Sequence, residues 1–421
     1  MPNHTPSSVN KLTLPNGVRI VTEAMDSVRS AAVGLWIGAG SRHEPEALGG
    51  VSHAIEHMVF KGTASRTAAE IAEQMDAIGG QVNAFTTKEA TSFYARALDS
   101  HLGRAIDLLC DILFQPRFAQ EDWETERGVI LEEIGMYEDS PEDLVGELLH
   151  SGIYRGSSLG RPILGCAETL NAMTAQQLKA YKDDAYRSES IVVSLAGHFS
   201  QRDVDDLSAR FSVLPKASRP VQETAAYQRV MVKKAKAIEQ NHLCLGFPSL
   251  PTGHPDRWAL QVLNGILGSG MSSRLFQQVR DQRGLCYTVY SYSSAHADCG
   301  SFGVYTALSK DTEAQALALI LQIIRDFRQN GPTAAELDRC REQMKANVLM
   351  GLESTSARMN RLGQGELILG KVTSPDEIIE RYDAVTREDV LRLAGQIFDE
   401  EKMSLSAVGE VDNTEYEELL K

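Results

Sequence analysis

The stretch GGVSHAIEHMVFKGT at residues 49–63 contains two histidines four residues apart, with a glutamate directly before the second. On a helix, positions four apart lie on one face, so the imidazoles of His53 and His57 can converge on one metal ion. Glu56 then lies beside the ion without having to ligate it. A metal-activated water needs this combination of nitrogen ligands and a carboxylate base. The pattern H-x-x-E-H therefore predicts a hydrolytic metal centre, and the alternative is two surface histidines beside a solvated glutamate.

A catalytic zinc ion usually has a third protein ligand in addition to water. The helix expected over 120–139 offers Glu126 and Glu133, which are seven residues apart and so share one face. Its apolar residues would hold the helix against the core, where a carboxylate needs a partner such as a metal ion. The alternative is a charged surface face, which is the better interpretation for Glu124 and Glu132.

The elements that position these residues follow from the hydrophobic periodicity. A Pro-Asn-Gly turn between alternating residues predicts a hairpin over 11–23. In the first half we expect strands at 31–38, 81–87, 91–98 and 191–197, and helices at 48–60, 67–78, 102–114, 120–139, 174–186 and 201–214. In the second half we expect strands at 229–232, 242–249, 286–294, 301–307 and at the end of 397–409, and helices at 254–268, 272–282, 311–329 and 333–351.

The polar segment 215–224 has two prolines and no periodicity, so we interpret it as a linker. It separates an N-terminal metal-binding domain, residues 1–214, from a C-terminal domain, residues 225–421, that lacks the motif. Both halves run strand, helix, short break and long charged helix, which indicates an ancient duplication. The sequence therefore predicts an α+β fold of two homologous domains, each a mainly antiparallel sheet with helices packed on it.

The composition narrows the range of partners. The chain has 421 residues and a formal net charge of -15, which argues against nucleic acids and anionic membranes as partners. No apolar run reaches the roughly 18 residues of a membrane span. The N-terminal residues lack a basic start followed by an apolar run, so we expect no signal peptide. Six cysteines without a CxxC pair suit reduced thiols and a cytoplasmic location.

Six segments stand out in this order: LPNGVRIV, VGLWIGAGSRHE, GGVSHAIEHMVFKGT, GGQVNAFTTKEATSFYA, ERGVILEEI and GSGMSSRLFQQVRDQRGLCYTVYSY. Taken together, they resemble the insulinase/pitrilysin family of zinc metallopeptidases. The nearest likeness is to a short bacterial branch, similar to the mitochondrial processing peptidase subunits. The resemblance covers nearly the whole chain.

The resemblance implies roles at the metal site. Glu133, the last residue of the ERGVILEE stretch, completes a site for one zinc ion per subunit with His53 and His57. Glu126 supports a ligand histidine by orienting its ring. Histidine and carboxylate ligands also suit manganese and cobalt, so the sequence leaves the identity of the metal open.

The resemblance also implies contacts to a peptide substrate. A strand resembling the family's edge strand is expected to pair with the substrate backbone, and the alternative is an ordinary strand. Its residues are Asn83, Ala84, Phe85 and Thr86. In the second half, Tyr287 is expected to donate a hydrogen bond to the oxyanion and Arg280 to grip a substrate carbonyl. From spacing alone, a surface arginine and a packed tyrosine remain the alternative.

The expected function is that of a zinc-dependent endopeptidase. It would hydrolyse peptides or unfolded segments within a closed chamber, by a metal-activated water with Glu56 as general base. Larger family members carry four such domains, so two domains imply a dimer. This chain keeps both the ligands and the Arg/Tyr pair, which favours a homodimer, with a sister chain as the other arrangement. The alternative function is a non-catalytic or partner subunit of a heterodimeric, processing-peptidase-like complex.

Overall fold

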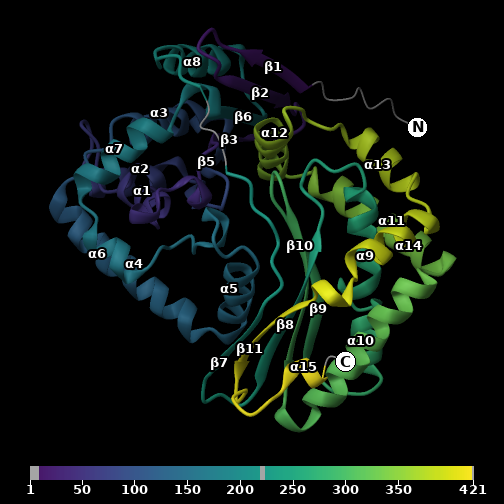
Figure 1. Cartoon of the computed structure of the whole chain (residues 1–421). Coiled ribbons are helices and arrows are strands. Elements are labelled where there is room, and N and C mark those ends of the chain that lie inside the picture. The colour runs from purple at the N-terminus through teal and green to yellow at the C-terminus, as the bar shows by residue number, and fades with distance from the viewer. Residues whose placement is uncertain (1–8, 219–222, 420–421) are drawn as a thin grey trace. The chain divides into compact units, whose positions relative to one another are not determined.

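Two β-sheets with matching strand patterns organise the chain, each in a separate unit (Figure 1). The computed structural model describes residues 9–218 and 223–419. The first unit is built from segments within Met1–Ile134, Arg161–Glu223 and Leu349–Thr373, and the second from segments within Gly135–Gly160, Thr224–Val348 and Ser374–Lys421. Part of the predicted linker, residues 219–222, lies outside the described residues.

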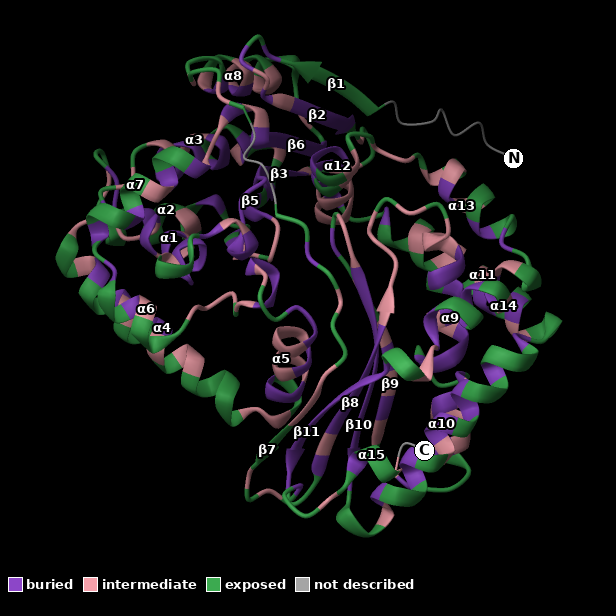
Figure 2. Ribbon diagram, in the orientation of Figure 1, coloured by how far each residue is buried: buried purple, intermediate pink, exposed green. Residues whose placement is uncertain are grey.

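The first sheet has the order β1-β2-β6-β3-β5-β4. Its strands are β1 (Val9–Thr13), β2 (Arg19–Ala24), β3 (Ser30–Ile37), β4 (Gln81–Thr86), β5 (Thr91–Leu98) and β6 (Ile191–Gly197). All neighbours pair antiparallel except β2 and β6. The β1–β2 pair confirms the hairpin predicted from the Pro-Asn-Gly turn, and β1 is exposed along its whole length (Figure 2). The strand β4 forms the other edge.

A layer of helices covers one face of the first sheet. It consists of α1 (Val51–Met58), α2 (Ala68–Ile78), α3 (Leu102–Phe114), α4 (Gln120–Asp139), α6 (Ala167–Ala172), α7 (Ala175–Ala185) and α8 (Gln201–Ser212). Short 3-10 turns, η1 (Ser41–His43), η2 (Glu46–Leu48), η3 (Asp99–His101) and η5 (Ser188–Ser190), connect them. Alternate residues of β3 point to opposite faces, as a strand requires. Val33 and Leu35 join the main core, whereas Ala32 and Trp36 pack with α12 (Thr355–Leu369) on the other face.

The second sheet has the order β7-β11-β8-β10-β9. Its strands are β7 (Met231–Ala235), β8 (Asn241–Ser249), β9 (Thr288–Ala295), β10 (Gly300–Leu308) and β11 (Ser404–Gly409). The helices of this unit are α5 (Pro141–Ile153), α9 (Arg257–Gly268), α10 (Lys310–Asn330), α11 (Ala334–Gly351), α13 (Pro375–Asp383), α14 (Arg387–Ile397) and α15 (Tyr416–Leu419), with 3-10 turns η4 (Ser158–Gly160) and η7 (Glu400–Lys402). The helix predicted at 272–282 is a π-helix, η6 (Phe276–Asp281).

The strand patterns of the two sheets correspond one to one. Removing β1 from the first sheet leaves β2-β6-β3-β5-β4, and the second sheet repeats this order as β7-β11-β8-β10-β9. Within the described residues, the single parallel pair of each sheet is β2 with β6 and β7 with β11. The predicted α+β fold, with two mainly antiparallel sheets covered by helices, is confirmed.

Two helices pack on the sheet that is formed by the other half of the sequence. The helix α12 comes from the second half of the sequence but contacts β2, β3 and β6 of the first sheet. Conversely, α5 comes from the first half and contacts β8 and β11 of the second sheet. Each follows a long charged helix, α4 or α11. The two copies therefore exchange one helix, which the predicted boundaries at 214 and 225 did not foresee.

Ion pairs between buried carboxylates and arginines hold α12 on the first sheet. In some the strand supplies the acid, and in another the helix does. Glu23 of β2 is fully buried and pairs with Arg358 and, at 2.6 Å, with Arg361 of the helix. In the opposite sense, buried Glu366 of the helix pairs with Arg19 of β2 at 3.2 Å. A buried charge that loses its partner is costly, so these pairs specify where α12 lies.

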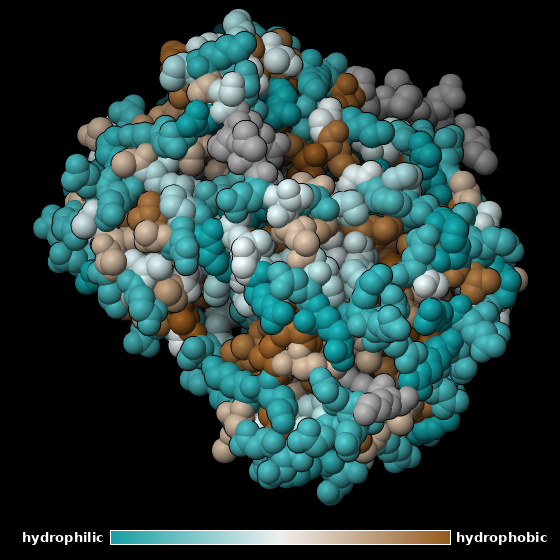
Figure 3. Space-filling view, viewed as in Figure 1, coloured by the Kyte–Doolittle hydropathy of each residue, from teal (hydrophilic) through white to brown (hydrophobic). Residues whose placement is uncertain are grey.

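The face of the molecule shown in Figure 3 is mostly hydrophilic, with hydrophobic side chains gathered in several small patches. Within residues 9–218 and 223–419, every helix is too short or too polar to cross a membrane.

Candidate metal centre

The helix α1 begins at a glycine that adopts a left-handed conformation. Gly50 has φ 95°, and a Cβ there would clash with the carbonyl oxygen of Leu164. The buried carboxylate of Glu44 accepts hydrogen bonds from the backbone N–H groups of Gly50, at 2.7 Å, and Ser52, at 2.8 Å. Burial raises the pKa of Glu44 to about 7, against the opposing effect of these two donors. The carboxylate therefore anchors the N-terminal turn of α1, which carries the H-x-x-E-H motif.

The two histidines of the motif project from α1 with their rings together. The ring centroids of His53 and His57 are 4.6 Å apart, and the ring planes meet at 64°. Burial, and then the neighbouring His57, lowers the pKa of His53 to about 4. His53 is therefore neutral at physiological pH and keeps a lone pair that can bind a cation.

The helix α4 brings a carboxylate to these rings. Trp123 and Ile130 bury one side of the helix in the core, and the indole of Trp123 donates to the carbonyl oxygen of Met173 at 2.9 Å. Glu133 Oε2 lies 3.7 Å from His53 Nε2 and 3.8 Å from His57 Nε2. Among the described residues, the three side chains form the one group of histidine, cysteine and acidic residues able to hold a metal ion, with one ligand atom each within 4.8 Å of the others.

Glu126 lies two helical turns before Glu133 on α4, and its carboxylate contacts His57 Nδ1. Its Oε2 is 3.1 Å from His57 Nδ1, and its Oε1 is 2.7 Å from Lys61 Nζ. The carboxylate is buried, whereas Glu124 and Glu132 of the same helix are exposed, as expected for solvated positions.

Glu56 is held by the edge strand. The hydroxyl of Thr86, at the end of β4, donates to Glu56 Oε2 at 2.5 Å. Burial raises the pKa of Glu56, and Glu133 adds to the rise, whereas the hydrogen bond from Thr86 and the charge of His57 oppose it. The Glu56 carboxylate therefore lies near His57 and Glu133, and Thr86 holds one of its two oxygens.

The four residues expected to contact substrate divide between the faces of β4. The side chain of Ala84 is buried in the main core and that of Thr86 reaches α1, whereas Phe85 packs edge-on against Trp36 on the opposite face. The side chain of Asn83 accepts a hydrogen bond from the N–H of Ala84 at 2.8 Å. Since β4 is an edge strand, its main chain is the part that can pair with another strand.

Arg280 and Tyr287 belong to the second unit and stack on each other. The guanidinium of Arg280 lies 4.6 Å from the ring centroid of Tyr287 and 4.7 Å from that of Phe276. Arg280 is in the π-helix η6, and Tyr287 is 74% exposed. The candidate ligands His53, His57 and Glu133, in contrast, all lie within the first unit.

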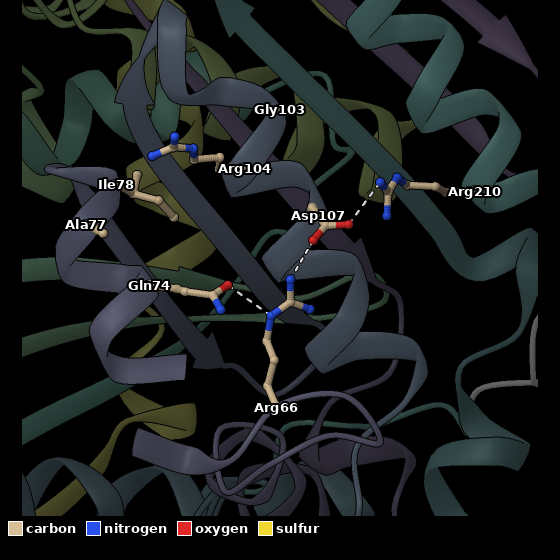
Figure 4. A pocket seen from close by; sticks show the side chains of 8 residues that line it. All are labelled: Arg66, Gln74, Ala77, Ile78, Gly103, Arg104, Asp107 and Arg210. Carbon is tan, nitrogen blue, oxygen red and sulfur yellow. Dashed lines mark hydrogen bonds and ion pairs between the residues drawn. The ribbon is translucent and has the colours of Figure 1, made fainter. Parts of the chain in front are cut away.

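One hollow in the first unit is separate from the ligand group. It has a volume of about 500 Å³ and is lined by eight residues of α2, α3, α8 and neighbouring turns (Figure 4). Arg66 and Arg210 both pair with Asp107, at 2.6 and 3.0 Å, so their charges are compensated. None of the residues in this hollow belongs to the predicted site.

Two contacts of the site were not expected from the sequence. Lys61 lies four residues after His57, a helical spacing that could have suggested a shared partner. Thr86 was expected to meet substrate. The alternation along β4, with Ala84 in the core, also places its side chain on the α1 face, where it contacts Glu56.

Comparisons with known proteins define the family. Residues 19–167 match the description "Insulinase (Peptidase family M16)", and residues 172–344 match "Peptidase M16 inactive domain". The chain is 44% identical over 394 residues to the uncharacterized zinc protease YmxG of Bacillus subtilis, covering 93% of this chain and 96% of that protein. It is 41% identical over 419 residues to the uncharacterized zinc protease SCO5738 of Streptomyces coelicolor, covering 96% and 90%. The chain therefore belongs to the M16 (insulinase) family of peptidases.

Two solved structures share the fold. A peptidase M16 inactive domain from Pseudomonas fluorescens gives a TM-score of 0.89 at 23% identity and covers 96% of this chain and 98% of that one. A protease from Helicobacter pylori gives a TM-score of 0.88 at 20% identity and covers 96% and 99%. At these identities the likeness establishes the architecture alone.

Proposed function

We propose that this protein is a zinc metalloendopeptidase, with His53, His57 and Glu133 as the metal ligands. The observation that carries the proposal is the convergence of these three side chains, whose ligand atoms lie within 4.8 Å of one another. The names of the relatives, which describe zinc proteases, support the same reading.

The donor set fits zinc. Two neutral imidazoles and one carboxylate are among the common ligand sets of catalytic zinc sites, which leave a fourth position open. Two ligands at about 2.1 Å from a tetrahedral ion lie about 3.4 Å apart. The separations of 3.7 and 3.8 Å from Glu133 to the two histidines are close to this value. The carboxylate therefore lies at nearly the ligand separation from both histidines.

Glu56 is proposed as the general base. Zinc, when bound, acidifies a water molecule and polarises a peptide carbonyl. Glu56 takes a proton from the attacking water and passes it to the leaving amine. Thr86 binds Glu56 Oε2, so Oε1 is the atom directed to this task. The raised pKa of Glu56 suits a group that must both accept and return a proton.

The substrate is proposed to be an extended peptide or unfolded segment. The free edge of β4 runs beside α1, and an edge strand can accept a further strand through its main chain. Such pairing uses hydrogen bonds to the substrate main chain and not to its side chains. It therefore favours extended or unfolded segments over folded proteins. Asn83 would have to release the N–H of Ala84 to let a substrate carbonyl bind there.

Arg280 and Tyr287 are proposed to contact the substrate from the second unit. Within the described residues the guanidinium of Arg280 has ring contacts but no acidic partner, so its N–H groups can bind a carbonyl. Tyr287 is exposed and can donate its hydroxyl to an oxyanion. Because one chain carries both this pair and the ligand group, we propose a homodimer as the active form. Activity at full rate in protein that sediments as a monomer would contradict that assembly.

Metal removal tests the proposed function. Purified protein should contain about one zinc ion per chain and cut a peptide mixture at sites mapped by mass spectrometry. A chelator should abolish cleavage, and an equimolar amount of zinc should restore it. Undiminished cleavage after complete metal removal would refute the proposal. Zinc-loaded protein that cuts no peptide would favour the non-catalytic partner subunit instead.

A further inference from the structure

Lys61 lies at the end of the motif helix, beyond the H-x-x-E-H residues. After α1 ends at Met58, the chain continues in a helical turn, in which the N–H of Phe60 donates to the carbonyl of His57 at 3.3 Å and that of Lys61 to the carbonyl of Met58 at 3.1 Å. These hydrogen bonds join residues three apart, as in a 3-10 turn, and from there Lys61 Nζ reaches the same carboxylate that His57 contacts.

Both side chains converge on a single carboxylate of α4. Glu126 Oε2 is 3.1 Å from His57 Nδ1, and Glu126 Oε1 is 2.7 Å from Lys61 Nζ. The Glu126 side chain is 7% exposed and that of Lys61 is 36% exposed. Each carboxylate oxygen thus has one partner, and the ammonium is the only cationic side chain paired with Glu126 within the described residues.

A buried carboxylate is stable only when its charge is compensated and its oxygens are hydrogen-bonded. The Lys61 ammonium compensates the charge of Glu126 and donates a hydrogen bond to its Oε1. Oε2 then accepts from Nδ1–H of His57, which leaves the lone pair of Nε2 directed to Glu133, 3.8 Å away. His53 has no equivalent support, because its Nδ1 is buried without a hydrogen-bond partner in the described part of the chain.

We propose that Lys61 is a positioning residue for the metal centre. It acts through Glu126 to fix the ring orientation and tautomer of His57, and so raises the affinity for zinc. This inference rests on the proposed function, since it takes His57 as a zinc ligand.

The direction in which Lys61→Met changes zinc affinity distinguishes a positioning role from direct electrostatic repulsion. Lys61 is a positive charge near a site for a cation, so direct repulsion alone predicts that Lys61→Met increases zinc affinity. Positioning predicts the opposite, a loss of about 10- to 100-fold, as is typical when the partner of a ligand histidine is disturbed. Lys61→Arg keeps a charged donor and should stay within a few-fold of the native protein. Lys179→Met removes another lysine of the first unit, paired with exposed Asp183, and should change nothing.

Zinc affinity is measured by competition with a chromophoric chelator, which needs no peptide substrate. The same measurement in a Glu126→Gln background tests whether the effect passes through Glu126, because the further loss on Lys61→Met should then disappear. Equal or higher affinity of Lys61→Met in the native background overturns the inference. An undiminished loss in the Glu126→Gln background also overturns it.

A second readout uses the metal-free protein. Nitrogen-15 correlation spectra of the imidazoles report which ring nitrogen of His57 carries the proton. The native protein should show Nδ1–H, and Lys61→Met should show a mixture of tautomers. An unchanged Nδ1–H signal in Lys61→Met contradicts the inference. Native protein that binds no zinc would instead refute the proposed function, so the two failures are distinguishable.

Discussion

At the scale of single residues, the carboxylate of Glu56 is fixed at one of its two oxygens. The Thr86 hydroxyl donates to Oε2 at 2.5 Å, and Oε1 has no protein partner among the described residues. A hydrogen bond to a charged group contributes about 1.5–3 kcal/mol. If this contact keeps the base in its reactive orientation, its loss should reduce the rate of the chemical step and not the binding of substrate.

Thr86→Val tests this role, because valine keeps the shape of threonine and removes the donor. We expect kcat to fall by about 10- to 100-fold, with KM and zinc content unchanged. Thr86→Ser keeps the hydroxyl and should retain most of the activity. Steady-state kinetics with one mapped peptide measures the effect. A valine variant with native kcat would show that Glu56 needs no anchor.

The sequence predicted that His53, His57 and Glu133 come together, because its signals are local. His53 and His57 are one helical turn apart, and Glu126 and Glu133 are two turns apart on one helix, so both sets follow from helical spacing. What the spacing could not give is which oxygen meets which nitrogen. The shared contact of Glu126 with Lys61 and His57 depends on how α1 and α4 pack, since these residues are more than 60 positions apart.

At the scale of elements, the exchanged helix α12 depends on close packing against the first sheet. Gly363 of α12 lies directly against the indole of Trp36 on β3, where a Cβ would overlap the ring. The Trp36 indole is further held by a hydrogen bond to Ser194 Oγ at 2.9 Å. The ring therefore cannot move aside without losing a buried partner.

Gly363→Ala should destabilise the protein by about 1–3 kcal/mol, the usual effect of overpacking, although alanine favours helix. Gly128→Ala is the matched control, because that glycine is inside α4 with open space at its Cβ position. It should stabilise by up to about 1 kcal/mol. Urea denaturation followed by circular dichroism measures both. Equal stability of the two variants would contradict the packing argument.

The strands and the longest helices were predicted, whereas the helices α5, α6, α12, α13, α14 and α15 were not. Helix α12 carries Arg358, Arg361 and Glu366 among its apolar residues, which weakens its amphipathic pattern. Those charges are paired with β-strand residues more than 300 positions away, including Glu23 and Arg19. Single-sequence periodicity does not contain such distant partners, so neither the helix nor its exchange was visible.

At the scale of the whole chain, the structure supports a duplication in which one copy carries the candidate metal ligands. The two sheets repeat the same strand order, and the ligand group occurs in the first unit. Sequence order alone indicated the repeat, because the corresponding strands and long helices follow each other at similar distances. The second copy keeps the same strand order and carries Arg280 and Tyr287, which we propose to contact substrate.

Zinc content and peptide cleavage of Glu56→Gln, measured on the same preparation, test the central claim most directly. The account predicts one zinc ion per chain, as in the native protein, because Glu56 is no ligand. It also predicts a cleavage rate reduced by at least about 100-fold, since the general base is lost. Glu132→Gln, an exposed position of α4, should behave as the native protein. A Glu56→Gln variant that holds zinc and cleaves at the native rate would contradict the account.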